Sequence, residues 1–104
     1  MRKKLDPIPP GEFLWKEFME PLGLSQNKLA RNIDVPVTRI SDIIHGRRGI
    51  TADSALRLSV YFGTTAEFWL NLQAKYDLGS VENQKAARIA REVLTLREVT
   101  ARQS

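Results

Sequence analysis

Apolar residues along this 104-residue chain recur mainly at intervals of three and four positions, which is the spacing of helices that bury one face. Leu14, Phe18 and Leu22 follow this spacing near the N-terminus, and Phe68 and Leu72 follow it further along. No segment shows the alternation expected of a half-buried strand, and no internal repeat is present. The pattern predicts an all-α fold in which short connections join the helices.

Capping residues mark where the predicted helices begin. Ser25, Thr51 and Thr65 each precede an apolar series, and their side-chain oxygens can accept a hydrogen bond from a free backbone N–H of the first turn. Proline suits the first turn, where a missing N–H costs little, and glycine suits the residue just after a helix. Five helices are therefore expected to begin near Pro10, Ser25, Pro36, Thr51 and Thr65.

The composition changes at both ends of this helical region. Closely spaced prolines before Gly11 predict an extended arm. After Gly79 the chain becomes rich in Ala, Arg, Glu and Val, and Ile89, Val93 and Leu96 are spaced for a separate sixth helix. We therefore expect an N-terminal arm (1–9), a compact five-helix domain (10–78) and a C-terminal helical extension (79–104).

The segment from Ser25 to His45 has the pattern of two short helices joined by a tight turn. Ala30 provides the small residue needed where the two helices touch, and Ile40 and Ile43 provide the buried side of the second helix. This arrangement is typical of a helix-turn-helix, whose second helix enters the major groove of double-stranded DNA. We predict that this recognition helix begins near Pro36.

The outer side of the predicted recognition helix is polar and suited to base edges. Arg39 could contact a guanine through two hydrogen bonds, whereas Gln26 and the pair Arg47 and Arg48 are placed for the phosphate backbone. The predicted DNA-binding residues are Gln26, Asn27, Val37, Thr38, Arg39, Ser41, Asp42, His45, Arg47 and Arg48. Sixteen Lys and Arg against twelve Asp and Glu give a formal charge of +4, which suits a polyanionic partner.

Composition also excludes several classes of protein. The absence of cysteine removes disulfides, thiol catalysis and cysteine-ligated zinc. Neither a membrane-spanning apolar run nor a signal peptide is present, which favours a cytoplasmic protein without a membrane partner. The lone histidine has no carboxylate pair at metal-ligand spacing, and no phosphate-binding loop or nucleophile motif occurs. We predict neither an enzyme nor a metal or cofactor site.

Residues 8–78 resemble the HigA-type antitoxins, a group of phage-repressor-like helix-turn-helix proteins in which some relatives are called virulence-associated protein I. The resemblance depends on the sequence PGE at residues 10–12, the G-x-R-x-I-T loop at 46–51 and EFWLNLQAKYDL at 67–78. One departure is Pro9, where family members often carry histidine. The resemblance implies an antitoxin that represses its own operon as a homodimer on operator DNA and neutralises a RelE-like ribonuclease toxin of the HigB type.

Family resemblance also places the dimer contacts after the recognition helix. Trp69 and Tyr76 are the interface candidates here, because their polar ends tolerate a partly wet surface. The residues leave two alternatives open: a transcriptional regulator without a toxin partner, and a C-terminal segment that contacts the toxin, extends the dimer or only packs on its own domain.

Overall fold

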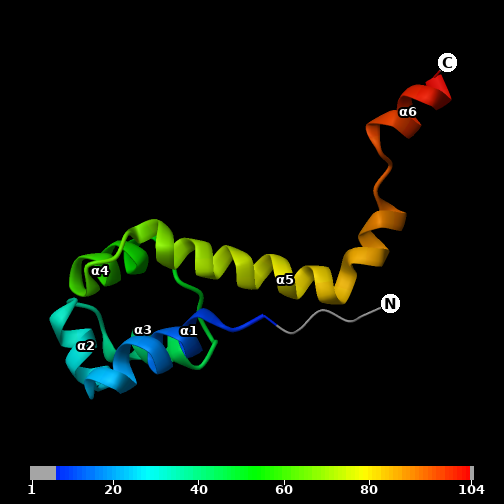
Figure 1. Ribbon diagram of the computed structural model, residues 1–104. Helices are drawn as coiled ribbons and strands as arrows, with labels where there is room; N and C mark the ends of the chain where they lie inside the picture. Colours follow the sequence, from blue (N-terminus) through cyan, green and yellow to red (C-terminus); the bar gives the residue numbers. More distant parts are fainter. Residues whose placement is uncertain (1–6, 104) are drawn as a thin grey trace.

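The computed structural model describes residues 7–103, which form helices and no strand, so the all-α prediction is confirmed. A continuous helical segment comes first, and its hydrogen-bond pattern changes from α through π to 3₁₀. The elements are α1 (Pro10–Phe13), η1 (Leu14–Met19), η2 (Glu20–Leu22), α2 (Gln26–Asn32), α3 (Val37–Ile44), α4 (Ala52–Phe62), α5 (Ala66–Glu92) and α6 (Leu96–Gln103). The first three parts are followed by α helices, of which α2, α3, α4 and the first part of α5 surround one core, whereas α6 lies away from it (Figure 1).

The expected capping residues begin and end the helices as predicted. Ser25, Thr51 and Thr65 each accept a hydrogen bond from the backbone N–H three residues later, at 3.1, 3.3 and 3.1 Å respectively. Gly63 follows α4 with a φ of 77°, in the left-handed region that glycine enters without steric cost. Local chemistry therefore sets these boundaries.

The π-helical part of the first helix changes which side chains are buried. Leu14 and Met19 are fully buried, whereas Leu22 is 70% exposed. The expectation that Leu22 continues the apolar face of Leu14 is therefore wrong. A π turn closes its hydrogen bonds one residue later than an α turn, so Met19 joins the half-buried Phe18 in facing the core and Leu22 turns away from it.

Trp69, at the start of α5, lies at the centre of the core. Its side chain is 0% exposed, and its indole Nε1 donates a hydrogen bond to Thr64 Oγ1 at 2.7 Å. The rings of Phe18, Phe62 and Phe68 surround it at centroid distances of 4.8 to 6.0 Å. The prediction that Trp69 forms a dimer contact is wrong, because its polar atom is satisfied within the subunit and no surface is left for a partner.

The predicted helix boundary at Gly79 is also wrong, because α5 runs without a break from Ala66 to Glu92. Glycine inside a helix costs about 1 kcal/mol relative to alanine, but it ends a helix only when it leaves the helical conformation, and Gly79 stays helical. The helix-forming residues that follow then continue α5 as far as Val93, which is extended. A second helix, α6, completes the C-terminal extension.

The molecule measures 62 × 28 × 22 Å, because the C-terminal part of α5 and the whole of α6 project from a compact helical domain (Figure 1). Side chains of the projecting half of α5 are exposed. Of the predicted N-terminal arm, residues 1–6 lie outside the described residues, while Pro7–Pro9 precede α1 without regular structure. Pro7 lies beside α5 at Gly79.

Candidate nucleic-acid interface

The connection between α2 and α3 has the tight turn of a helix-turn-helix. Asp34 adopts a left-handed conformation with φ of 59°, which aspartate tolerates better than most residues. The N–H of Val35 then donates to the carbonyl of Ala30 at 3.0 Å, closing the turn onto the end of α2. Pro36 is the N-cap of α3, as predicted.

The helix α3 presents a buried and an exposed side. Ile40 and Ile43 are buried in the core. Thr38 and His45 are exposed, and Val37 is 40% exposed. Three further candidates on this helix, Arg39, Ser41 and Asp42, are half-buried. The predicted division of the helix between a folding side and an outer side is therefore present in the structure.

His45 and Ser41 interact at the C-terminal end of this outer side. His45 Nδ1 lies 2.8 Å from the backbone carbonyl oxygen of Ser41. Since a carbonyl oxygen only accepts hydrogen bonds, this contact places the proton on Nδ1. A neutral His45 then has Nε2 as an acceptor, which suits a donor such as a base amino group.

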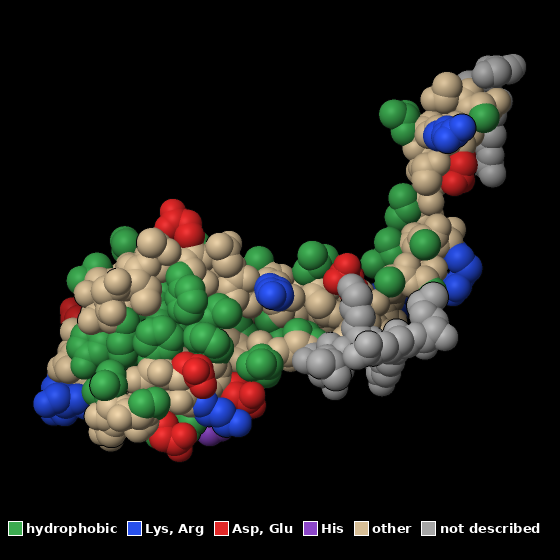
Figure 2. Space-filling model, viewed as in Figure 1, with side chains coloured by type: hydrophobic (Ala, Val, Ile, Leu, Met, Phe, Trp, Pro, Cys, Tyr) green, Lys and Arg blue, Asp and Glu red, His purple; other side chains and the backbone are tan. Residues whose placement is uncertain are grey.

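Asp42 holds the arginines of the loop that follows α3. Arg47 Nε lies 3.0 Å from Asp42 Oδ1, and Arg48 Nη2 lies 3.7 Å from Asp42 Oδ2. The backbone N–H groups of both arginines also donate to the carbonyl of Asp42, at 2.8 and 3.2 Å. Figure 2 shows basic and acidic side chains side by side at the lower edge of the domain. Asp42 therefore positions Arg47 and Arg48 next to the end of α3.

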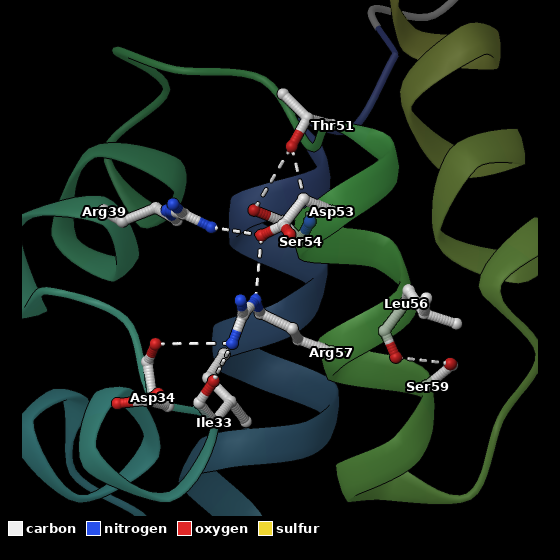
Figure 3. Close-up of polar contacts among 9 residues, drawn as sticks. All are labelled: Ile33, Asp34, Arg39, Thr51, Asp53, Ser54, Leu56, Arg57 and Ser59. Atoms are coloured by element: carbon white, nitrogen blue, oxygen red, sulfur yellow. Dashed lines mark hydrogen bonds and ion pairs between the residues drawn. The ribbon is translucent and has the colours of Figure 1, made fainter.

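Arg39 points toward α4 and not away from the domain. Its Nη1 lies 2.6 Å from Asp53 Oδ2, and Arg57 Nε lies 2.8 Å from the same oxygen (Figure 3). Hydrogen bonds from Arg57 first and then from Arg39 lower the pKa of Asp53 below its ordinary value. The guanine contact of Arg39 stays a prediction, and the side chain already has an anionic partner within the protein.

Gln26 and Asn27 lie in the first turn of α2, half-buried and exposed respectively. The predicted phosphate contact of Gln26 and the predicted DNA contact of Asn27 stay predictions. The described residues bring the predicted DNA-binding side chains of α3 and the following loop to one region of the domain. They contain no group of three or more His, Cys, Asp or Glu arranged to hold a metal ion.

Asp53, Arg57 and Gln73 are not among the residues predicted from the sequence. Gln73 Oε1 accepts a hydrogen bond from the N–H of Ile50 at 2.8 Å. This bond ties the loop between α3 and α4 (residues 45–51, the basic loop) to α5. The spacing of Asp53 and Arg57, four residues apart with opposite charges, is the signal that could have revealed that pair. Nothing in the sequence pattern marks Gln73, because its partner is 23 residues away.

A family model described as helix-turn-helix matches residues 16–69. Virulence-associated protein I of Dichelobacter nodosus is 46% identical over 84 residues, covering 81% of this chain and 78% of that protein. Antitoxin HigA-1 of Vibrio cholerae is 37% identical, covering 98% of this chain and 99% of its own. The structure of the Pseudomonas aeruginosa antitoxin HigA with the higBA promoter is 41% identical with a TM-score of 0.82, covering 86% of this chain and 98% of that one.

Fold and sequence together define a helix-turn-helix protein. Within that class, the chain belongs to the family of the HigA antitoxins and virulence-associated protein I. The resemblance inferred from the PGE, loop and EFWLNLQ segments is thereby confirmed. Among the residues described, no helix is long and apolar enough to cross a membrane.

Proposed function

We propose that this protein is a cytoplasmic antitoxin that binds operator DNA as a homodimer, represses its own operon and neutralises a RelE-like ribonuclease toxin of the HigB type. The observation that carries the DNA-binding part is α3, which packs through Ile40 and Ile43 and leaves Thr38 and His45 exposed. The P. aeruginosa HigA solved with promoter DNA supports the same use of the fold. In this role the protein is not an enzyme.

On DNA, α3 lies in the major groove. Thr38, Ser41 and His45 face the base edges, because they share the outer side of the helix. Arg47 and Arg48 contact phosphates from the loop, where they are 59% and 47% exposed. In a symmetric dimer two such helices are separated by about 34 Å, one turn of DNA.

Tyr76 remains the proposed dimer contact on α5. Its side chain is half-buried beside the segment Pro9–Gly11 and the basic loop, where a cavity of about 190 Å³ opens. A partner subunit can reach this part of α5, whereas it cannot reach Trp69. The toxin-binding half of the proposal comes from membership of the antitoxin family.

Two measurements test the proposal separately. Footprinting on the DNA upstream of the gene is expected to show two protected segments one helical turn apart. Co-expression with a RelE-like ribonuclease toxin of the HigB type from the same organism is expected to restore growth. A variant carrying both Thr38→Ala and His45→Ala should lose the footprint but still restore growth.

The combination of a normal footprint and no growth rescue would favour the alternative, a regulator without a toxin partner. Loss of both activities in a variant that remains folded would show that one surface serves both partners. Absence of any footprint with the wild-type protein would contradict the DNA-binding half of the proposal.

A further inference from the structure

An ion-pair cluster joins the recognition helix to α4 (Figure 3). Asp53, in the first turn of α4, accepts hydrogen bonds from Arg39 of α3 and from Arg57 one turn further along α4. Both contacts end on the same carboxylate oxygen, at 2.6 and 2.8 Å. The cluster therefore bridges two elements that are separated by the whole basic loop.

Arg57 extends the cluster to the turn of the helix-turn-helix. Its Nη1 donates to the carbonyl of Ile33 at 2.9 Å and to that of Asp34 at 3.3 Å. Ile33 is the C-cap of α2 and Asp34 is the left-handed residue of the turn. A cation suits this place, because the carbonyls at a helix C-terminus lack partners and carry partial negative charge. One guanidinium thus contacts the turn and Asp53 together.

The position of Arg39 on α3 explains what the cluster can control. Successive residues of a helix are separated by about 100°, so Arg39 lies on the flank of α3 between the buried Ile40–Ile43 side and the outer side with Thr38 and His45. Its side chain is only 27% exposed. A contact on this flank restricts rotation of α3 about its own axis, and that rotation decides which outer side chains reach the bases.

We propose that Asp53 and Arg57 are positioning residues for DNA reading, which together hold the turn and the flank of the recognition helix in register. This inference depends on the proposed DNA-binding function. It predicts that loss of the cluster reduces discrimination between sequences more than it reduces affinity for DNA in general.

The negative charge of Asp53 distinguishes a positioning role from a bystander role, in which the carboxylate would affect DNA binding only through electrostatic repulsion. Asp53 is a half-exposed carboxylate near the proposed DNA surface. As a bystander it would only repel phosphates, so its neutralisation would tighten binding to every duplex alike. If Asp53 is a positioning residue, its neutralisation leaves the affinity for scrambled DNA unchanged or higher. The affinity for the operator then falls relative to the affinity for scrambled DNA.

The test measures the affinity of the full-length protein for the footprinted operator and for a scrambled duplex of equal length, over a series of salt concentrations. For Asp53→Asn we expect the operator-to-scrambled ratio to fall about tenfold, the scale of one lost base contact. Arg57→Lys keeps the charge but loses the forked geometry, and it should lower the ratio in the same direction. Glu67→Gln is the control, since it also removes a carboxylate from the first turn of a helix.

An unchanged ratio in both cluster variants would overturn the inference. If Asp53→Asn fails to fold by circular dichroism, the ratio for Arg57→Lys decides in its place. If Glu67→Gln lowers the ratio as much as the cluster variants, the effect comes from charge alone and the inference fails. A wild-type protein that does not prefer the operator would contradict the proposed function itself, a result distinct from a preference that the variants retain.

Discussion

Gly11 in α1 is a position where one added methyl group should disrupt the domain. It is buried where α1 packs on the C-terminal end of α3. A Cβ atom at this position would lie 2.6 Å from the carbonyl carbon of Ile43 and 2.7 Å from Cα of Ile44, and nearer still to the Ile43 carbonyl oxygen. These neighbours are backbone atoms, so no side-chain rotation can relieve the overlap.

The expected cost of Gly11→Ala follows from that geometry. Carbon atoms pack at about 3.5–4.0 Å, so the carbon contacts alone require α1 and α3 to separate by about 1 Å, and the nearer carbonyl oxygen requires more. Overpacking of this kind costs about 1–3 kcal/mol and occasionally more, while alanine regains about 1 kcal/mol of helix propensity. We expect the upper part of the range, a net loss of about 2 kcal/mol, which lowers the Tm of a domain of this size by about 10 °C.

Thermal unfolding followed by circular dichroism measures this loss. Gly79→Ala provides a matched control, since Gly79 is also helical but its added Cβ would meet only the Pro7 side chain, at 3.3 Å. Pro7 belongs to the arm and can move by the few tenths of an ångström required, so the Tm should be unchanged or slightly higher. A Gly11→Ala protein that melts within about 2 °C of the wild type would refute the reasoning.

Three further predictions concern single interactions. Gln73→Ala leaves the N–H of Ile50 without its acceptor and should cost about 1–3 kcal/mol in urea unfolding, because a part-buried donor is then unsatisfied; an unchanged midpoint would show that water replaces the glutamine. Arg48→Ala should weaken operator and scrambled DNA alike and reduce the salt slope by about 1; a change in base preference alone would contradict a phosphate contact.

The third is a pH dependence. The pKa of Asp53 is lowered in the folded protein relative to its ordinary value of 3.8. Its stabilising contribution is therefore present above that value and is lost as the pH falls through the lower folded-state pKa. The stability difference between wild type and Asp53→Asn should shrink when unfolding is measured below that pH, and a difference that grows there would contradict the assignment.

The sequence predicted the elements whose causes are local. Ser25, Thr51 and Thr65 each cap a helix through a hydrogen bond from the backbone N–H three residues later. Pro36 precedes α3 as its N-cap, because the fixed φ of proline suits a helix start. The buried side of α3 was equally predictable from spacing. These features need no knowledge of the rest of the fold.

Features that depend on packing were not predictable in the same way. Trp69 is of a residue type common at interfaces, yet Thr64 Oγ1 accepts the hydrogen bond of its indole N–H inside the core. Gly79 is of the residue type that often ends a helix, yet the backbone of Gly79 stays helical and α5 continues through it. Arg39 was assigned to the bases from its residue type, and only the fold shows that Asp53, fourteen positions away, lies against it.

The central claim is that the outer side of α3 reads the operator, and fluorescence anisotropy tests it most directly. The wild type and the variant with both Thr38→Ala and His45→Ala are titrated with operator and scrambled duplexes at one salt concentration. We predict that the wild type prefers the operator by at least about 10³-fold, and that the variant binds both duplexes with nearly equal affinity. A folded variant that keeps the wild-type preference would contradict the account.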